Sequence, residues 1–163
     1  MIILGIDPGS RITGFGLVSK QGSKITHVDN GIIDVSKNVS FEKKLLKIFE
    51  GINNIISTFK PSEVAIENIF YAKNVQSALK LGHARGAAMV AIAMNELPVF
   101  EYTPLQVKQA VTGFGAASKD QVQKMTKTLL GLPQVAEENA ADALGISLCH
   151  AQSRDLKRIL HDR

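Results

Sequence analysis

The sequence predicts one α/β domain built on a five-stranded mixed sheet, in which a three-strand antiparallel meander is followed by parallel strands and helices flank the sheet. Two observations predict this fold class. The chain opens with three short β-forming segments separated by turn residues, and after them helical periodicity alternates with short apolar segments. A chain of 163 residues, 45% of them hydrophobic, is large enough to bury one core without disulfides. We therefore expect a single domain over residues 1–163, in which the last residues, about ten of them, form a frayed polar tail that includes Arg154.

The first predicted strand, residues 2–7, is an apolar run that ends in Asp7 and is followed by the turn pair Pro8-Gly9. Residues 13–19 and 24–35 complete the meander as the second and third strands. A carboxylate at the end of an apolar central strand needs a cation, a helix cap or a metal as its partner, because burying an unpaired charge is costly. A simple turn-forming role ahead of Pro-Gly is the alternative that stays open for Asp7.

Helical periodicity begins after Ser40, which is predicted to cap a helix that reaches Phe59 and carries lysines opposite its apolar face. Pro61 ends this helix, and residues 63–67 are predicted as a fourth strand, which ends in Glu67. Because a helical crossover connects this strand to the meander, we expect it to run parallel to its neighbour in the sheet.

The next helix, predicted over residues 75–96, contains small residues such as Gly82 and Gly86 that would allow another backbone to approach closely. Tight packing on the sheet and a subunit interface both explain them, since a glycine inside a helix costs about 1 kcal/mol. The remaining predicted elements are a strand over 97–102, a short helix capped by Thr103 with proline next to it, a helix capped by Ser118 that runs to residue 130, and a last helix from 137 to about 159.

The net charge of +4 and the isoelectric point near 9.2 permit a polyanionic partner. Between residues 103 and 130 the only acid is Asp120, and this stretch contains Lys108, Lys119, Lys124 and Lys127. Such a local excess favours contact with phosphates, although a solvated helix face is the alternative for any one lysine. We expect Asp7 to lie away from this lysine patch.

No run approaches the roughly 18 apolar residues that cross a bilayer, and the single cysteine, Cys149, is typical of a reducing compartment. We therefore expect a cytoplasmic protein without membrane association. The four histidines are too scattered for a zinc site.

Three acids fall on three separate elements: Asp7 and Glu67 end two strands, and Asp142 lies early in the last helix, where Asn139 precedes it on the same face. Hydrolysis of a phosphodiester with two magnesium ions needs carboxylates that converge from rigid elements, because hard cations bind oxygen ligands. Spacing along the sequence does not establish that they converge. The acids Glu137 and Glu138 are explained by the dipole at the start of the helix.

Four stretches, together covering much of the chain, resemble the RuvC family of crossover-junction endodeoxyribonucleases, the bacterial Holliday junction resolvases. They are GIDPGSRITGFG, AIENIFYAKNVQSALKLGHARGAA, PVFEYTPLQVKQAVTGFGAASKDQV and NAADALGISLCH. The resemblance implies a ribonuclease H-like fold and a nuclease that cuts four-way DNA junctions in recombination and repair. It also implies a homodimer that works with a branch-migration complex.

The resemblance further implies two Mg²⁺ ions per subunit, for which Mn²⁺ can substitute. The implied metal-binding and catalytic residues are Asp7, Glu67, Asn139 and Asp142. The expected DNA contacts are Phe70, Tyr71, Lys73, Lys108, Lys119 and Lys124, of which Phe70 would act in opening the junction core.

One position departs from the family pattern, since Asn139 stands where the family usually has aspartate. An amide oxygen can bind magnesium, but the amide carries no charge and cannot act as a base. Either a neutral ligand is accepted here or the chain is an engineered, slow-cutting version, and a non-catalytic junction-binding protein is the corresponding rival function. An actin-like ATPase also shares the opening strand and turn, but it requires a second lobe for which the chain has no room.

Overall fold

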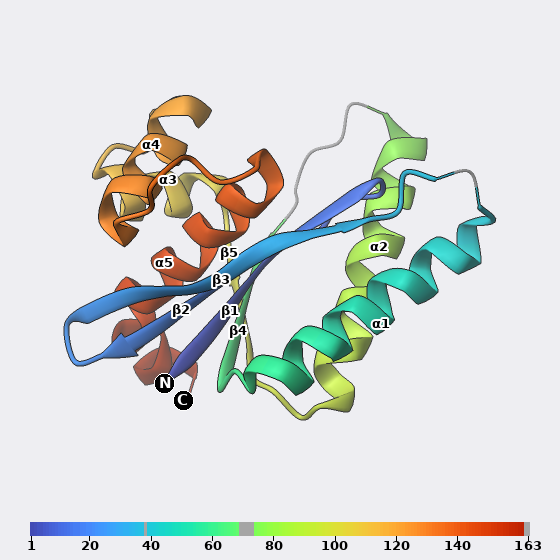
Figure 1. The fold of residues 1–163 in the computed structure, drawn as a ribbon, viewed down its shortest axis with the longest axis horizontal. Coiled ribbons are helices and arrows are strands. Elements are labelled where there is room, and N and C mark those ends of the chain that lie inside the picture. Colours follow the sequence, from blue (N-terminus) through green and yellow to red (C-terminus); the bar gives the residue numbers. More distant parts are fainter. Residues whose placement is uncertain (38, 69–73, 162–163) are drawn as a thin grey trace.

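The computed structural model describes residues 1–37, 39–68 and 74–161, with side chains up to Arg154 in the last helix. A five-stranded sheet lies between two helical layers, with α1 and α2 on one face and α3, α4 and α5 on the other (Figure 1). The elements in chain order are β1 (Ile2–Asp7), β2 (Ile12–Gln21), β3 (Lys24–Asp34), α1 (Phe41–Phe59), β4 (Glu63–Glu67), α2 (Val75–Met94), β5 (Val99–Tyr102), α3 (Pro104–Thr112), α4 (Lys119–Leu130) and α5 (Glu138–His161).

The strand order is β3-β2-β1-β4-β5, with antiparallel pairing among β1, β2 and β3 and parallel pairing of β4 with β1 and β5. The predicted meander followed by parallel strands is therefore confirmed. Since β1 and β4 are parallel neighbours at the centre of the sheet, their carboxyl ends meet at one edge.

The core fills both faces of β1. Leu4 and Ile6 point into an apolar cluster with Ile48 and Ile52 of α1. On the other face glycines let α5 approach the strands closely: a β-carbon at Gly16 would lie 2.6 Å from the backbone nitrogen of Leu144. Any side chain there would push α5 away from the sheet.

Local signals located most helix ends correctly. Thr103 and Ser118 both form capping boxes, as predicted. Ser40 occupies the position before α1 but makes no capping hydrogen bond through its side chain, so that prediction was wrong in its mechanism. Arg154 was wrongly placed in the frayed tail, because its guanidinium forms an ion pair with Glu63 at 2.8 Å, which fixes this part of α5 on β4.

The small residues of α2 divide between two faces. Ala84 and Ala88 are buried in the core cluster that includes residues of α1 and of the sheet, whereas Gly82 and Gly86 have open space where a β-carbon would stand. Tight packing therefore explains the alanines but not the glycines. Within the described residues, no helix is long and apolar enough to span a bilayer.

Candidate active site

Three carboxylates meet between the sheet and α5. Gly5 lies against the α5 backbone, and side chains alternate along a strand, so Asp7 faces α5 as well. Glu63 contacts α5 through its side chain, and Glu67, four residues further along β4, points to the same face. Asp142 comes from the second turn of α5. The three acids that the sequence singled out are thus brought together from three elements.

Repulsion among the three carboxylates contributes to raised pKa values at two of them. Burial, followed by the charges of Glu67 and Asp142, raises the pKa of Asp7 from 3.8 to about 8. Burial and the charge of Asp142 also raise the pKa of Glu67. The site therefore holds more negative charge than its surroundings compensate, and a bound cation would relieve this excess.

The acids are electrostatic neighbours rather than a preformed metal cage. Among the described residues, no three or more His, Cys, Asp or Glu side chains are arranged to bind one ion. Asp142 is instead paired with a lysine: Nζ of Lys119 lies 2.8 Å from Oδ2 of Asp142 and 2.6 Å from Oε1 of Glu138. An ammonium group thus already neutralises part of the negative charge of Asp142.

Asp7 does not lie away from the lysine patch, contrary to expectation, because Lys119 is near enough for its charge to act on the pKa of Asp7, against the larger effects that raise it. A pocket of about 300 Å³ is lined by Glu67, Pro104, Val107, Lys108, Lys119, Val122, Asp142 and Ile146. The prediction was wrong because α4 packs near the amino-terminal turns of α5, where Lys119 contacts Glu138 and Asp142. Lys124 is placed differently, because it pairs within α4 with Asp120 at 2.7 Å and is 69% exposed.

Asn139 lies in the first turn of α5, where Glu137 holds it. Nδ2 of Asn139 donates to Oε1 of Glu137 at 2.9 Å, and the backbone N–H groups of Asn139 and Ala140 donate to Oε2 at 2.9 and 3.1 Å. Sequence reasoning gave Glu137 only a dipole role, although an acid just before a helix is a recognisable capping signal. Its charge also contributes to the raised pKa of Asp7, after burial and the charges of Glu67 and Asp142.

A second, more open hollow borders Asn139. It measures about 530 Å³ and is lined by Gly9, Ser10, Arg11, Ile12, Ser36, Leu81 and Asn139. Phe70, Tyr71 and Lys73, which the sequence proposed as DNA contacts, lie outside the described residues. Their roles stay predictions.

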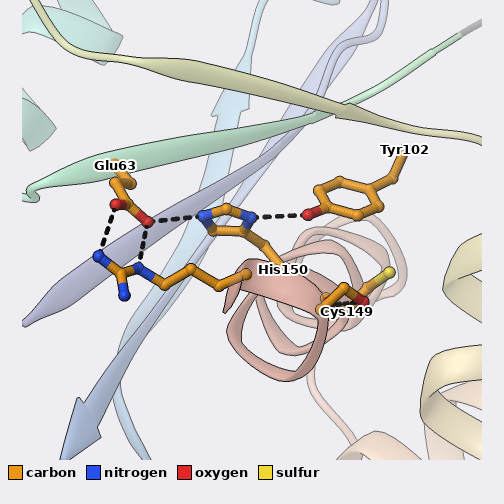
Figure 2. A network of polar contacts seen from close by, with 6 residues as sticks. Glu63, Tyr102, Cys149 and His150 are labelled. Atoms are coloured by element: carbon orange, nitrogen blue, oxygen red, sulfur yellow. Dashed lines mark hydrogen bonds and ion pairs between the residues drawn. The ribbon is translucent and has the colours of Figure 1, made fainter. Parts of the chain in front are cut away.

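A buried polar network that the sequence did not reveal ties α5 to β4 and β5 (Figure 2). Nε2 of His150 lies 2.8 Å from Oε2 of Glu63, and Nδ1 lies 2.7 Å from the hydroxyl of Tyr102. Arg154 adds two hydrogen bonds to Glu63. Since Tyr102 pairs with Glu67 across β4 and β5, this network fixes the strand end that carries Glu67 relative to α5.

A mixed five-stranded sheet with helices on both faces, and with carboxylates from β1, β4 and α5 at one edge, defines a ribonuclease H-like nuclease domain. A family model described as crossover junction endodeoxyribonuclease RuvC matches residues 3–150. The RuvC protein of Geotalea uraniireducens is 58% identical over 160 residues, covering 98% of this chain and 94% of that protein. The RuvC protein of Geobacter sulfurreducens is 52% identical and covers 98% of each.

Solved structures agree with the sequence comparison. The structure of T. thermophilus RuvC in complex with Holliday junction substrate superimposes with a TM-score of 0.91 at 33% identity, covering 96% of both chains. The yeast mitochondrial Holliday junction resolvase Ydc2 has a TM-score of 0.65 at 12% identity, covering 98% of this chain and 85% of that one, and shows the fold alone. The chain belongs to the RuvC family of crossover junction endodeoxyribonucleases, and its activity is the cleavage of DNA at such junctions. The rival interpretation as a non-catalytic junction-binding protein is not favoured.

Proposed function

We propose that Asp7, Glu67, Asn139 and Asp142 hold two Mg²⁺ ions and that the protein uses them to resolve four-way DNA junctions by phosphodiester hydrolysis. The observation that carries the proposal is the raised pKa of Asp7, because burial and two neighbouring carboxylates leave its charge uncompensated. The donor set fits the ion, since carboxylate and amide oxygens are the ligands that Mg²⁺ binds. Mn²⁺ is expected to substitute for Mg²⁺.

Each acid has a distinct part in this proposal. Asp7 interacts with both other carboxylates, so it would be shared between the ions, with Asp142 completing one site and Glu67 the other. Bound Mg²⁺ would supply charge stabilisation of the attacking and leaving oxygens. Lys119 pairs with Oδ2 of Asp142, and if a bound ion displaced this contact, the ammonium group would be available to a DNA phosphate.

Lys108 lines the same pocket as the acids and would hold the phosphate backbone beside the cutting site. Lys124, which is exposed on α4, would contribute at longer range. We assign Phe70 and Tyr71 to the branch point, where an aromatic ring can stack on an unpaired base, and Lys73 to the adjacent phosphates.

We further propose a homodimer that forms through α2. The outward face of this helix carries an apolar stripe at helical spacing, formed by Val75, Leu79, Val90 and Met94 with Gly82 and Gly86 between them. Val75 is 78% exposed and Met94 69%. A twofold dimer would match the two equivalent strands of a four-way junction. Leu79→Glu is expected to yield monomers in sedimentation equilibrium, whereas a protein that is monomeric before the change would refute this interface.

The central experiment is cleavage of a synthetic four-way junction with and without Mg²⁺. Wild-type protein is expected to cut only with the ion, and Asp7→Asn is expected to abolish cutting while junction binding in Ca²⁺ stays within a few-fold. If folded Asp7→Asn protein lost binding and cutting together, Asp7 would be structural. Action alongside a branch-migration complex in the cytoplasm is the setting we expect from the family.

A further inference from the structure

The side chain of Asn139 has a defined orientation in the structure. A carboxylate only accepts hydrogen bonds, so the amide group that faces Oε1 of Glu137 must be Nδ2, and Oδ1 must point the other way. Within the described residues, no hydrogen bond reaches Oδ1. The oxygen of Asn139, which is the atom that can bind a metal ion, is therefore left available.

Glu137 is itself held in place. Its Oε2 accepts hydrogen bonds from two backbone N–H groups in the first turn of α5, those of Asn139 and Ala140. The helix dipole adds to these bonds, because an acid is stabilised at the amino end of a helix. The carboxylate thus has little freedom to turn away, and the orientation of the Asn139 amide follows from it.

This pair lies beside Asp7. The backbone carbonyl of Asn139 packs on Gly14, and Gly14 is the partner of Asp7 in the pairing of β1 with β2. The charge of Glu137 reaches far enough to contribute to the pKa of Asp7. The pair therefore belongs to the same electrostatic site as the three carboxylates.

We propose that Glu137 is a positioning residue, which turns the amide oxygen of Asn139 toward the metal site. The inference rests on the proposed metal-binding function of this site. Hydrogen bonds from outer residues orient metal ligands and typically change metal affinity by about 10- to 100-fold. A hydrogen bond from Nδ2 to a carboxylate also polarises the amide and makes its oxygen a better ligand.

The test is a double-mutant cycle of Glu137→Gln and Asn139→Asp, with Mg²⁺ titrated into the DNA-free protein and followed by calorimetry. With asparagine at position 139, Glu137→Gln is expected to raise the Kd for Mg²⁺ by about tenfold, because the amide is no longer oriented. With aspartate there, the same change is expected to alter the Kd by less than about twofold, because either orientation of a carboxylate presents an oxygen. Asp120→Asn removes an acid from the first turn of another helix, α4, and is expected to leave the Kd unchanged.

Equal effects of Glu137→Gln in both backgrounds would make Glu137 a distant charge and overturn the proposal. If Glu137→Gln lowered the melting temperature but left the Kd for Mg²⁺ unchanged, Glu137 would act only as a helix cap, and the proposal would be overturned as well. Should Glu137→Gln not fold, Glu137→Asp offers the same comparison, because the shorter side chain cannot reach the backbone and the amide together.

Asp7→Asn separates this inference from the function on which it rests. If the wild type does not bind Mg²⁺, or if Asp7→Asn leaves Mg²⁺ binding intact, the proposed function fails and the inference fails with it. If Asp7→Asn removes Mg²⁺ binding while Glu137→Gln does not change it, only the role of Glu137 is refuted.

Discussion

Asp7→Asn is expected to stabilise the metal-free protein while it abolishes cutting. The pKa of Asp7 rises from 3.8 to about 8 on folding, first through burial and then through Glu67 and Asp142. Below pH 3.8 Asp7 is protonated in both the folded and the unfolded protein, so its ionisation does not lower the free energy of unfolding. As the pH rises, the unfolded state loses its proton and the folded state keeps it, so stability falls until the pH passes the folded pKa.

The size of the effect follows from the shift. Each unit of pKa difference corresponds to about 1.4 kcal/mol, which gives a ceiling of about 4 kcal/mol at pH 7. Relaxation and water entry reduce such penalties in proteins, so we expect a gain of about 2 kcal/mol for Asp7→Asn. In a domain of this size that gain corresponds to a rise of about 4–8 °C in melting temperature.

The assay is thermal unfolding in EDTA between pH 5 and pH 8, with Asp120→Asn as the control for loss of an exposed acid. The wild type should lose stability with rising pH more steeply than Asp7→Asn, and Mg²⁺ should restore stability only in the wild type. Because Asp7 holds a proton at pH 7, Mg²⁺ binding should also release about one proton per site, measurable by calorimetry in two buffers. Equal melting temperatures and equal pH slopes for the two proteins would refute the argument that the Asp7 carboxylate is destabilised by its surroundings.

Three further predictions concern DNA contact and stability. Lys108→Ala should lower the slope of log K against log salt for junction binding by about one, whereas Lys43→Ala on the opposite helical layer should not; equal slopes would return Lys108 to the solvated surface. Tyr102→Phe should lower the free energy of unfolding by about 0.5–1.5 kcal/mol in urea, because it removes the buried hydrogen bond between the Tyr102 hydroxyl and Nδ1 of His150; an unchanged free energy would mean that this hydrogen bond makes no net contribution. Phe70→Ala should reduce cutting per folded molecule if the ring stacks on a base, and a lower melting temperature with normal cutting would show instead that it anchors its loop.

The strand and helix pattern was predictable because local signals specify it. Turn residues, a helical crossover and two capping boxes are each contained within a few neighbouring positions. The facing of Asp7 and Glu67 also follows from the alternation of side chains along parallel strands. The contacts of Lys119 were not predictable, because they depend on where α4 returns over α5, and that placement is set by packing between residues far apart in the chain.

The buried hydrogen-bond network around His150 was not predictable from the sequence either. Glu63 is the first residue of a short strand, and nothing next to it in the sequence indicates a buried partner. Its partners lie 87 and 91 positions later, on one face of α5. Burial would raise the pKa of Glu63, but hydrogen bonds from Arg154 and His150 outweigh it and keep the pKa below the ordinary value. Such a network can be recognised only once the fold has brought these residues together.

The charge balance of the site explains why its acids and its lysine coexist. Close approach of α5 to β1 and β2, permitted by glycines such as Gly14 and Gly16, forces Asp142 toward Asp7. The crowded negative charge is compensated in two ways: the pKa of Asp7 is raised to about 8, and Lys119 pairs with Asp142. In the proposed function a metal ion would displace the proton of Asp7 and the ammonium group of Lys119, and Lys119 would then be available to a phosphate in the pocket that it lines. Metal binding and DNA binding should therefore strengthen each other at this site.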